Sequence, residues 1–179
     1  MSKTTQIIIS GFGGQGVLFA GKFLAYMGLT EGKNVSWLPS YGPEMRGGTA
    51  SCSVILSDDK VGSPIIANPD VLFAMNLPSL EKYQDTVKEG GCIILDSSLI
   101  DKKVERDDVK VCYIPATKIA KEIEAPTLAN MIMVGKMIKE TDAVSFEGLE
   151  AGLKKVISAK RADMLEVNLK AIETGYNFE

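Results

Sequence analysis

The sequence contains no histidine, and this absence removes several common kinds of active site. Histidine is the usual general base near neutral pH, the usual activator of serine and cysteine nucleophiles, and the most common metal ligand. The three cysteines, Cys52, Cys92 and Cys112, form no C-x-x-C pair, so we expect neither a zinc site nor an iron-sulfur cluster on this chain. Each lies in an apolar, strand-like segment and is interpreted as a small core residue. If the chain belongs to an enzyme, we expect much of the chemistry to lie elsewhere.

The chain also lacks an excess of positive charge and any long apolar run. Its 20 lysine and arginine residues face 23 acidic residues, and the net charge of -3 disfavours nucleic-acid binding. No apolar stretch approaches the roughly 20 residues that cross a bilayer, and residues 1–6 contain no signal-peptide core. We therefore expect a cytoplasmic protein without membrane contacts. A length of 179 residues fits one domain, 1–179.

What the sequence does have is a glycine-rich turn near its start. An apolar run at 7–9 breaks into four glycines, and apolar positions resume at Val17, which predicts a buried strand, a tight turn and a helix. Glycine lets a ligand approach the backbone without meeting a Cβ, and a helix start offers N–H donors and partial positive charge. The turn is therefore a candidate phosphate site. Its candidate binding residues are Gly11, Gly13, Gly14, Gln15 and Gly16.

Three interpretations of this turn stay open. The glycines satisfy the G-x-G-x-x-G dinucleotide pattern, but that pattern also needs an acidic residue at the end of the second strand. The second strand, 34–38, ends in Pro39-Ser40-Tyr41, and Glu31 precedes it, so a free-standing NAD site is disfavoured. A second interpretation is that the glycines only let a strand pass tightly into a helix. The third is a loop shaped for a phosphate or for another chain's backbone.

A second unusual stretch, neither helical nor strand-like, follows the second strand. It contains Arg46, one of three arginines in the chain, whose planar fork suits bidentate binding of a carboxylate or phosphate. Arg46 is the best single candidate for a ligand contact, and the alternative is that it pairs with Glu44 or backbone carbonyls to hold the loop. The stretch consists of Tyr41, Gly42, Pro43, Glu44, Met45, Arg46, Gly47 and Gly48.

The remaining pattern alternates strands and helices before becoming helical. We expect a strand at 49–56, a hairpin turn at 57–60 with a short return segment, and buried parallel strands at 71–75 and 92–95. Asn76 falls at a strand's carboxyl end, where open α/β sheets bind ligands. Asp96 also follows a buried strand, and of its two interpretations, a catalytic carboxylate or a cap of the following turn, capping is expected. Asn130 is interpreted as a satisfied structural amide beside a broad apolar helix face that Gly135 interrupts. These features predict an α/β fold, Rossmann-like and three-layered, with a mostly parallel sheet and a helical C-terminal part.

The glycine turn at 11–17, followed by the stretch at 41–48, resembles the gamma subunit, or gamma domain, of the 2-oxoacid:ferredoxin (acceptor) oxidoreductases. The resemblance covers nearly the whole chain. Supporting matches are Gly62–Ile65, Pro69-Asp70, Ala74–Asn76, Gly90-Gly91, Ile114–Thr117, Ala129–Met131 and Asn168.

This resemblance implies a hetero-oligomeric enzyme that oxidatively decarboxylates a 2-oxoacid, transfers the acyl group to coenzyme A and passes electrons to ferredoxin. In this family thiamine diphosphate with Mg is held by the alpha and beta subunits, and iron-sulfur clusters lie in a delta or the beta subunit. The gamma subunit is expected to carry no catalytic residue, to be inactive alone, to aid assembly and to contact coenzyme A. The amides of residues 13–17 would meet a phosphate, and the loop 41–48 would pack on the catalytic subunits while Arg46 binds an anion. The segments 49–56 and 76–82 favour 2-oxoglutarate or a branched-chain 2-oxoacid as substrate.

Overall fold

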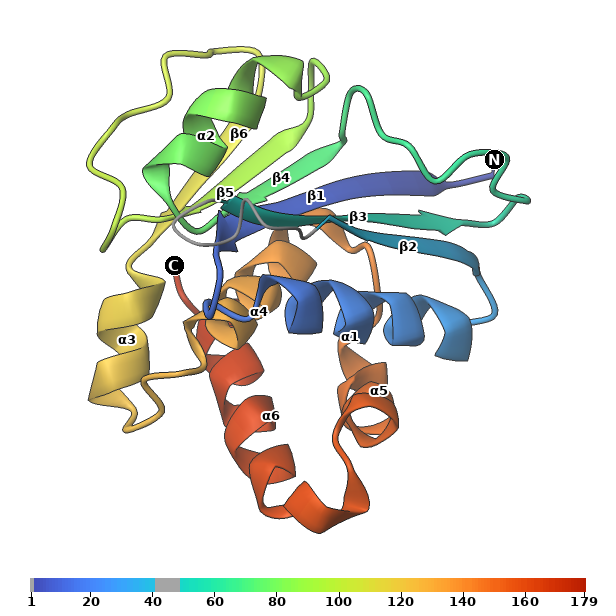
Figure 1. Cartoon of the computed structure of the whole chain (residues 1–179), viewed down its shortest axis with the longest axis vertical. Helices are drawn as coiled ribbons and strands as arrows, with labels where there is room; N and C mark the ends of the chain where they lie inside the picture. Colours follow the sequence, from blue (N-terminus) through green and yellow to red (C-terminus); the bar gives the residue numbers. More distant parts are fainter. Residues whose placement is uncertain (1, 41–48) are drawn as a thin grey trace.

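The computed structural model describes residues 2–40 and 49–179, and these contain a six-stranded sheet with helices on both faces (Figure 1). The strand order is β2-β3-β1-β4-β5-β6. The strands are β1 (Thr4–Phe12), β2 (Asn34–Ser40), β3 (Thr49–Ser57), β4 (Val71–Ala74), β5 (Cys92–Asp96) and β6 (Lys110–Ile114). The α-helices are α1 (Val17–Thr30), α2 (Leu77–Tyr83), α3 (Ala116–Glu122), α4 (Ala129–Thr141), α5 (Leu149–Val156) and α6 (Asp163–Tyr176), with short 3-10 turns η2 (Gln84–Thr86), η3 (Phe146–Gly148) and η4 (Ala159–Arg161).

The sheet is mixed but mostly parallel, which confirms the predicted α/β class. Strands β1, β4, β5 and β6 run parallel, with Ile7 opposite Val71 and Leu72 opposite Ile93. Strand β3 runs antiparallel to β1 on one side and to β2 on the other. The parallel part therefore carries its carboxyl ends at one edge, where the glycine turn follows β1.

The prediction of a β-hairpin after the strand at 49–56 is wrong. The turn at 57–60 leads to no return strand, since no described residue between 58 and 70 belongs to the sheet. Both edges of β3 are already occupied by β1 and β2, so a returning segment has nowhere to pair. The turn instead contacts the start of β1, where the backbone N–H of Asp58 donates to the Lys3 carbonyl (3.0 Å).

Alternate residues of the central strands face two separate cores. Ile7 and Ile9 point into the larger one, which α1, α4, α5 and α6 cover together with α3. Ile8, Leu72 and Ile93 point into the smaller one beneath α2. Figure 1 shows α2 on one side of the sheet and the other helices on the opposite side. The three-layer prediction is confirmed, with very unequal outer layers.

Helices α4 and α6 pack with their backbones in contact. A Cβ added to Gly135 would overlap the carbonyl oxygen of Ile172, and one added to Gly175 would overlap that of Ile132. Helix α4 continues through Gly135 without a break. Glycine here provides the space that a second helix fills.

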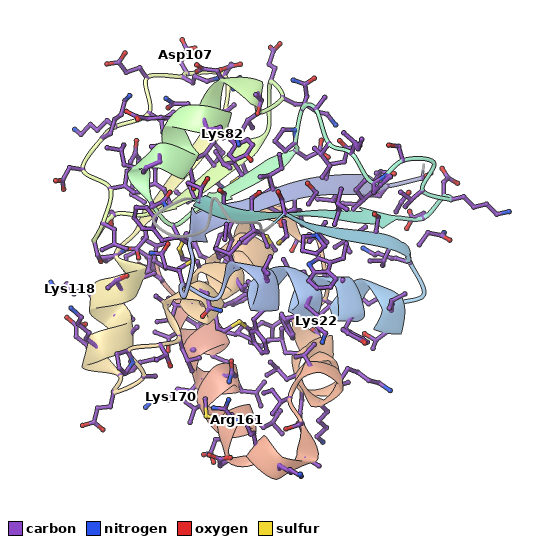
Figure 2. All side chains as sticks on the ribbon, in the orientation of Figure 1. Lys22, Lys82, Asp107, Lys118, Arg161 and Lys170 are labelled. Carbon is purple, nitrogen blue, oxygen red and sulfur yellow. The ribbon has the colours of Figure 1, made fainter. Side chains whose placement is uncertain are left out.

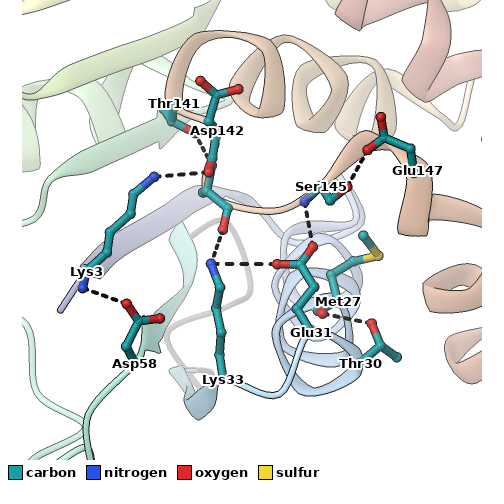
Figure 3. Close-up of polar contacts among 11 residues, drawn as sticks. Lys3, Met27, Thr30, Glu31, Lys33, Asp58, Thr141, Asp142, Ser145 and Glu147 are labelled. Carbon is teal, nitrogen blue, oxygen red and sulfur yellow. Dashed lines mark hydrogen bonds and ion pairs between the residues drawn. The ribbon is translucent and has the colours of Figure 1, made fainter. Parts of the chain in front are cut away.

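The connection after α4 is fixed to the far end of α1 (Figure 3). Lys33 Nζ donates to the Ala143 carbonyl (2.9 Å), and the Ser145 backbone N–H donates to Glu31 Oε1 (2.5 Å). Lys33 and Glu31 also form an ion pair (3.6 Å). These contacts hold the C-terminal helices against α1. Across residues 2–40 and 49–179, no helix has the length and apolar character needed to cross a membrane.

Candidate functional site

The glycine turn has the predicted strand, turn and helix context. β1 ends at Phe12 and α1 begins at Val17, with Gly13 and Gly14 exposed between them. Gly14 and Gly16 have φ values of +89° and +76°, in the left-handed region that glycine adopts without strain. The start of α1 therefore opens onto an exposed stretch of backbone at the carboxyl edge of the sheet.

The glycines of the turn are required for different physical reasons. A Cβ on Gly11 would lie 2.9 Å from Met75 Cβ, and one on Gly16 would overlap the Asn130 side chain, 2.9 Å from its Cγ. Close packing explains these two positions. A Cβ on Gly14 would meet no atom within 4 Å, so the space beside this residue is open to a ligand.

Gln15 braces the turn through its side chain. Its Oε1 accepts from the Phe12 backbone N–H (2.6 Å), and its Nε2 donates to the Met75 carbonyl (3.1 Å). The Gln15 backbone N–H donates to the Phe12 carbonyl (3.2 Å). The N–H groups of Gly13 and Gly14 donate to no other group in the described part of the chain. These two exposed amides are therefore available to donate to an anion.

The second predicted stretch, 41–48, lies outside the described residues. The roles assigned to Arg46, as an anion ligand, and to Tyr41, Gly42, Pro43, Glu44, Met45, Gly47 and Gly48, as an interface or active-site loop, therefore stay predictions. The same holds for ligand binding by Gly11, Gly13, Gly14, Gln15 and Gly16, whose positions are known.

Two polar residues at the same sheet edge stabilise local structure. The buried Asp96 accepts from the backbone N–H of Ser98 (3.0 Å) and from the backbone N–H (3.1 Å) and hydroxyl (2.5 Å) of Thr117. The carboxylate thus joins the end of β5 to the start of α3, which confirms the capping interpretation. Asn76 caps α2 by accepting from the Ser79 N–H (2.8 Å).

A cavity behind the turn is a feature that sequence reasoning missed. It has a volume of about 460 Å³ and lies between the starts of α1 and α4 and the first turns of α6, with Gly16, Phe19, Leu128, Asn130, Arg161 and Asn168 among its lining residues. Asn130 Nδ2 donates to the Gly16 carbonyl (3.1 Å), but its Oδ1 has no partner among the described residues. The expectation of a fully satisfied amide is therefore wrong for the oxygen. The one feature of the sequence that pointed to this cavity was an Asn placed beside an apolar helix face.

The three cysteines are buried, as predicted. Burial raises the pKa of the Cys52 thiol to about 12. The hydrogen bond that the Cys92 thiol donates to Cys112, together with burial, raises the pKa of Cys92, while the same bond lowers the pKa of Cys112. Cys52 is therefore a poor nucleophile at neutral pH. Over residues 2–40 and 49–179, no cluster of three or more Cys, Asp or Glu side chains has the arrangement to hold a metal ion.

The fold and the turn together define an α/β domain with an exposed glycine turn at the carboxyl edge of its parallel strands. The family model described as pyruvate ferredoxin/flavodoxin oxidoreductase matches residues 6–178, so the chain belongs to this family. The predicted resemblance is confirmed.

Three similar proteins refine this result. The ketoisovalerate oxidoreductase subunit VorA of Methanothermobacter marburgensis is 39% identical over 178 residues, which cover 97% of this chain and 36% of VorA. The chain thus spans about a third of that relative's length. The keto/oxoacid ferredoxin oxidoreductase gamma subunit of Geobacter sulfurreducens has a TM-score of 0.81 and 30% identity, over 96% of both chains.

The third is a structure of 2-oxoglutarate:ferredoxin oxidoreductase from Magnetococcus marinus with 2-oxoglutarate, coenzyme A and succinyl-CoA bound. It has a TM-score of 0.86 and 26% identity, and the match covers 97% of this chain and 30% of that one. The same domain therefore occurs as a separate gamma subunit and within longer chains, and this chain has the gamma-subunit fold.

Proposed function

We propose that this chain is the gamma subunit of a multi-subunit 2-oxoacid:ferredoxin oxidoreductase. The complex oxidatively decarboxylates a 2-oxoacid, forms the acyl-CoA and passes electrons to ferredoxin. The observation that carries the proposal is the match to a separate gamma subunit over 96% of both chains. The cytoplasmic location and the extent of a single gamma domain over 1–179 belong to the same proposal.

The chemistry is divided among the subunits. The chain has no histidine, and burial leaves Cys52 protonated at neutral pH, so the chain alone is inactive. Alpha, beta and delta partner subunits supply thiamine diphosphate, Mg and iron-sulfur clusters. This chain aids assembly and contributes one side of the coenzyme A site.

The coenzyme A contact is proposed at the glycine turn. The exposed amides of Gly13 and Gly14 and the start of α1 present donors and partial positive charge to a phosphate, and the space beside Gly14 is open. Coenzyme A supplies the acyl-accepting thiol when it is bound to the complex. The role of this chain's backbone is to bind and orient the phosphate end, with Arg46 as a second anion ligand.

The favoured substrates are 2-oxoglutarate and a branched-chain 2-oxoacid. The names of the relatives support both, since VorA is a ketoisovalerate oxidoreductase subunit and the Magnetococcus marinus structure has 2-oxoglutarate bound.

Two other functions receive less support. An independent NAD enzyme would need the second strand beside β1, with an acidic residue at its end. Here β3 is inserted between β1 and β2, so β2 ends away from the turn. A purely structural subunit is the remaining alternative, and a kinetic experiment separates it from the ligand-contact proposal.

The experiment compares Gly14→Ala with Gly32→Ala in the assembled complex. Both glycines have φ near +75° to +90° and open space around the added Cβ, so both changes impose similar backbone strain. Of these two glycines, Gly14 lies at the glycine turn and Gly32 does not. We expect the Michaelis constant for coenzyme A to rise about tenfold in Gly14→Ala, as for the loss of one charge-assisted hydrogen bond, and to stay unchanged in Gly32→Ala. Arg46→Ala should act like Gly14→Ala. Equal constants in all variants, with normal assembly, would favour the purely structural role.

A further inference from the structure

The outer edge of β2 is an open strand edge. β2 is the terminal strand on its side of the sheet, and among the described residues it pairs with β3 alone (Figure 1). Such an edge presents backbone N–H and C=O groups that can pair with another strand. Soluble proteins usually block it with charged side chains, a short strand or a covering segment. β2 is seven residues long and contains no charged residue, so it lacks this protection.

The opposite edge of the sheet is protected. β6 has five residues and begins with Lys110, whose ammonium group pairs with Glu140. Part of the connection before β6 also lies against it, since the Val104 backbone N–H donates to the Tyr113 hydroxyl (3.0 Å). The two edges therefore differ, and β2 is the one open to a further strand.

The hydrogen-bond pattern identifies which groups of β2 face outward. The N–H of Asp58, directly after β3, donates to the Lys3 carbonyl next to β1 (3.0 Å). Backbone groups of successive residues point to alternate sides of a strand, so the odd-numbered residues of β3 bond to β2. Their partners on β2 are Asn34, Ser36, Leu38 and Ser40. The backbone groups of Val35 and Trp37 therefore point to the open edge. Pro39 also faces this edge, where its missing N–H costs no bond to β3.

The side chains beside this edge are apolar and carry little charge. Trp37 and Leu38 are 37% and 42% exposed, on opposite faces of the sheet. Trp37 packs along α1, where a Cβ added to Gly21 would lie 3.1 Å from its Nε1. α1 has one charged residue, Lys22 (Figure 2). Lys33, directly before β2, is already engaged in an ion pair (3.6 Å). An uncharged strand therefore suits this edge better than an acidic or basic one.

We propose that β2 pairs antiparallel with β2 of a second copy of this chain, across a two-fold axis at Ser36. Val35 of each copy then lies opposite Trp37 of the other, and each of these two pairs exchanges two backbone hydrogen bonds. All outward N–H and C=O groups of both residues become paired. Because β2 has no charged residue, no like charges meet across the axis. The proposal concerns this strand alone and does not rest on the function proposed above.

The first test is the oligomeric state of the full chain, measured by sedimentation velocity from about 5 to 500 µM. We expect a dimer with a dissociation constant below about 100 µM. A chain that stays monomeric over the whole range would overturn the proposal.

Two lysine variants locate the contact. Ser36→Lys places two like charges opposite each other at the axis, and we expect the dissociation constant to rise at least about tenfold. Ser40→Lys is the matched control, because it makes the same change on the same face of β2 but away from the axis. It should leave the constant unchanged. A dimer that Ser36→Lys does not weaken would place the contact on another surface and contradict the proposal.

Cysteine cross-linking tests the register without relying on these variants. In the proposed pairing the two Ser36 residues form a non-hydrogen-bonded pair with Cα atoms about 4.5 Å apart, within the range of a disulfide. The two Ser40 residues lie roughly 27 Å apart. With a mild thiol oxidant, Ser36→Cys should give a disulfide-linked dimer on a non-reducing gel and Ser40→Cys should not. The three native cysteines are buried. Absence of the Ser36→Cys cross-link, or equal cross-linking of both variants, would overturn the proposed pairing.

Discussion

Glu140 is the centre of an ion-pair cluster on α4. It contacts Lys110 on β6 and Lys136 one helical turn away (2.7 Å), and its side chain is 13% exposed. The hydrogen bonds from these two lysines hold the pKa of Glu140 below its ordinary value of 4.5. Because the folded pKa is lowered, the carboxylate stabilises the fold above pH 4.5, and this contribution is lost as the pH falls through the folded pKa.

We expect Glu140→Gln to lower the free energy of unfolding by about 1–2 kcal/mol at pH 7, since it leaves two lysines without their partner. The difference from the unmodified protein should shrink below pH 4.5. Urea denaturation between pH 7 and pH 3 measures this. Glu150→Gln is the control, because Glu150 pairs with Lys154 on an exposed surface and should show no measurable change. An equal cost of Glu140→Gln at pH 7 and pH 3 would show that the charge is not responsible.

At the residue scale, the sequence predicted groups whose partners are close along the chain or at a strand end. Asp96 was expected to cap a turn, and it does so through Ser98. Asn130 was expected to be fully paired, but its environment depends on α6, which starts more than 30 residues later. The fate of a buried amide is decided by tertiary packing that a local pattern does not contain.

At the scale of elements, the contact between α4 and α6 should be the least tolerant of change. A methyl group on Gly135 would collide with the Ile172 carbonyl, and backbone atoms cannot move aside as a flexible side chain can. We expect Gly135→Ala to lower the free energy of unfolding by more than about 3 kcal/mol, measured by urea denaturation. Gly62→Ala, where the added Cβ meets no atom within 4 Å, should change it little. Similar stabilities of the two variants would contradict the packing described here.

Most elements were predictable because their periodicity is local. The glycine turn, the buried strands and the C-terminal helices follow from apolar spacing and turn residues. The partner of β3 did not follow, because strand pairing joins residues far apart in sequence, such as Phe12 and Thr49. Gly135 was interpreted as an interruption because only the position of Gly175 reveals why glycine is needed.

At the scale of the whole molecule, the chain is proposed to act as a supporting subunit. The described residues provide a six-stranded sheet, an exposed glycine turn and a cavity, and they contain no cluster of side chains arranged to hold a metal ion. The cavity could not be predicted, because it forms where three helices from distant parts of the sequence meet. Under the proposed function, partner subunits supply the remaining parts of the active site.

The most direct test is anaerobic affinity purification of this chain from its native host, followed by an assay of dye reduction. The account predicts that chains carrying thiamine diphosphate purify with it and that dye reduction requires both a 2-oxoacid and coenzyme A. A panel of 2-oxoacids should then give the highest rate with 2-oxoglutarate or a branched-chain 2-oxoacid. Recovery of the chain alone, without partners or activity, would contradict the proposed role as a gamma subunit.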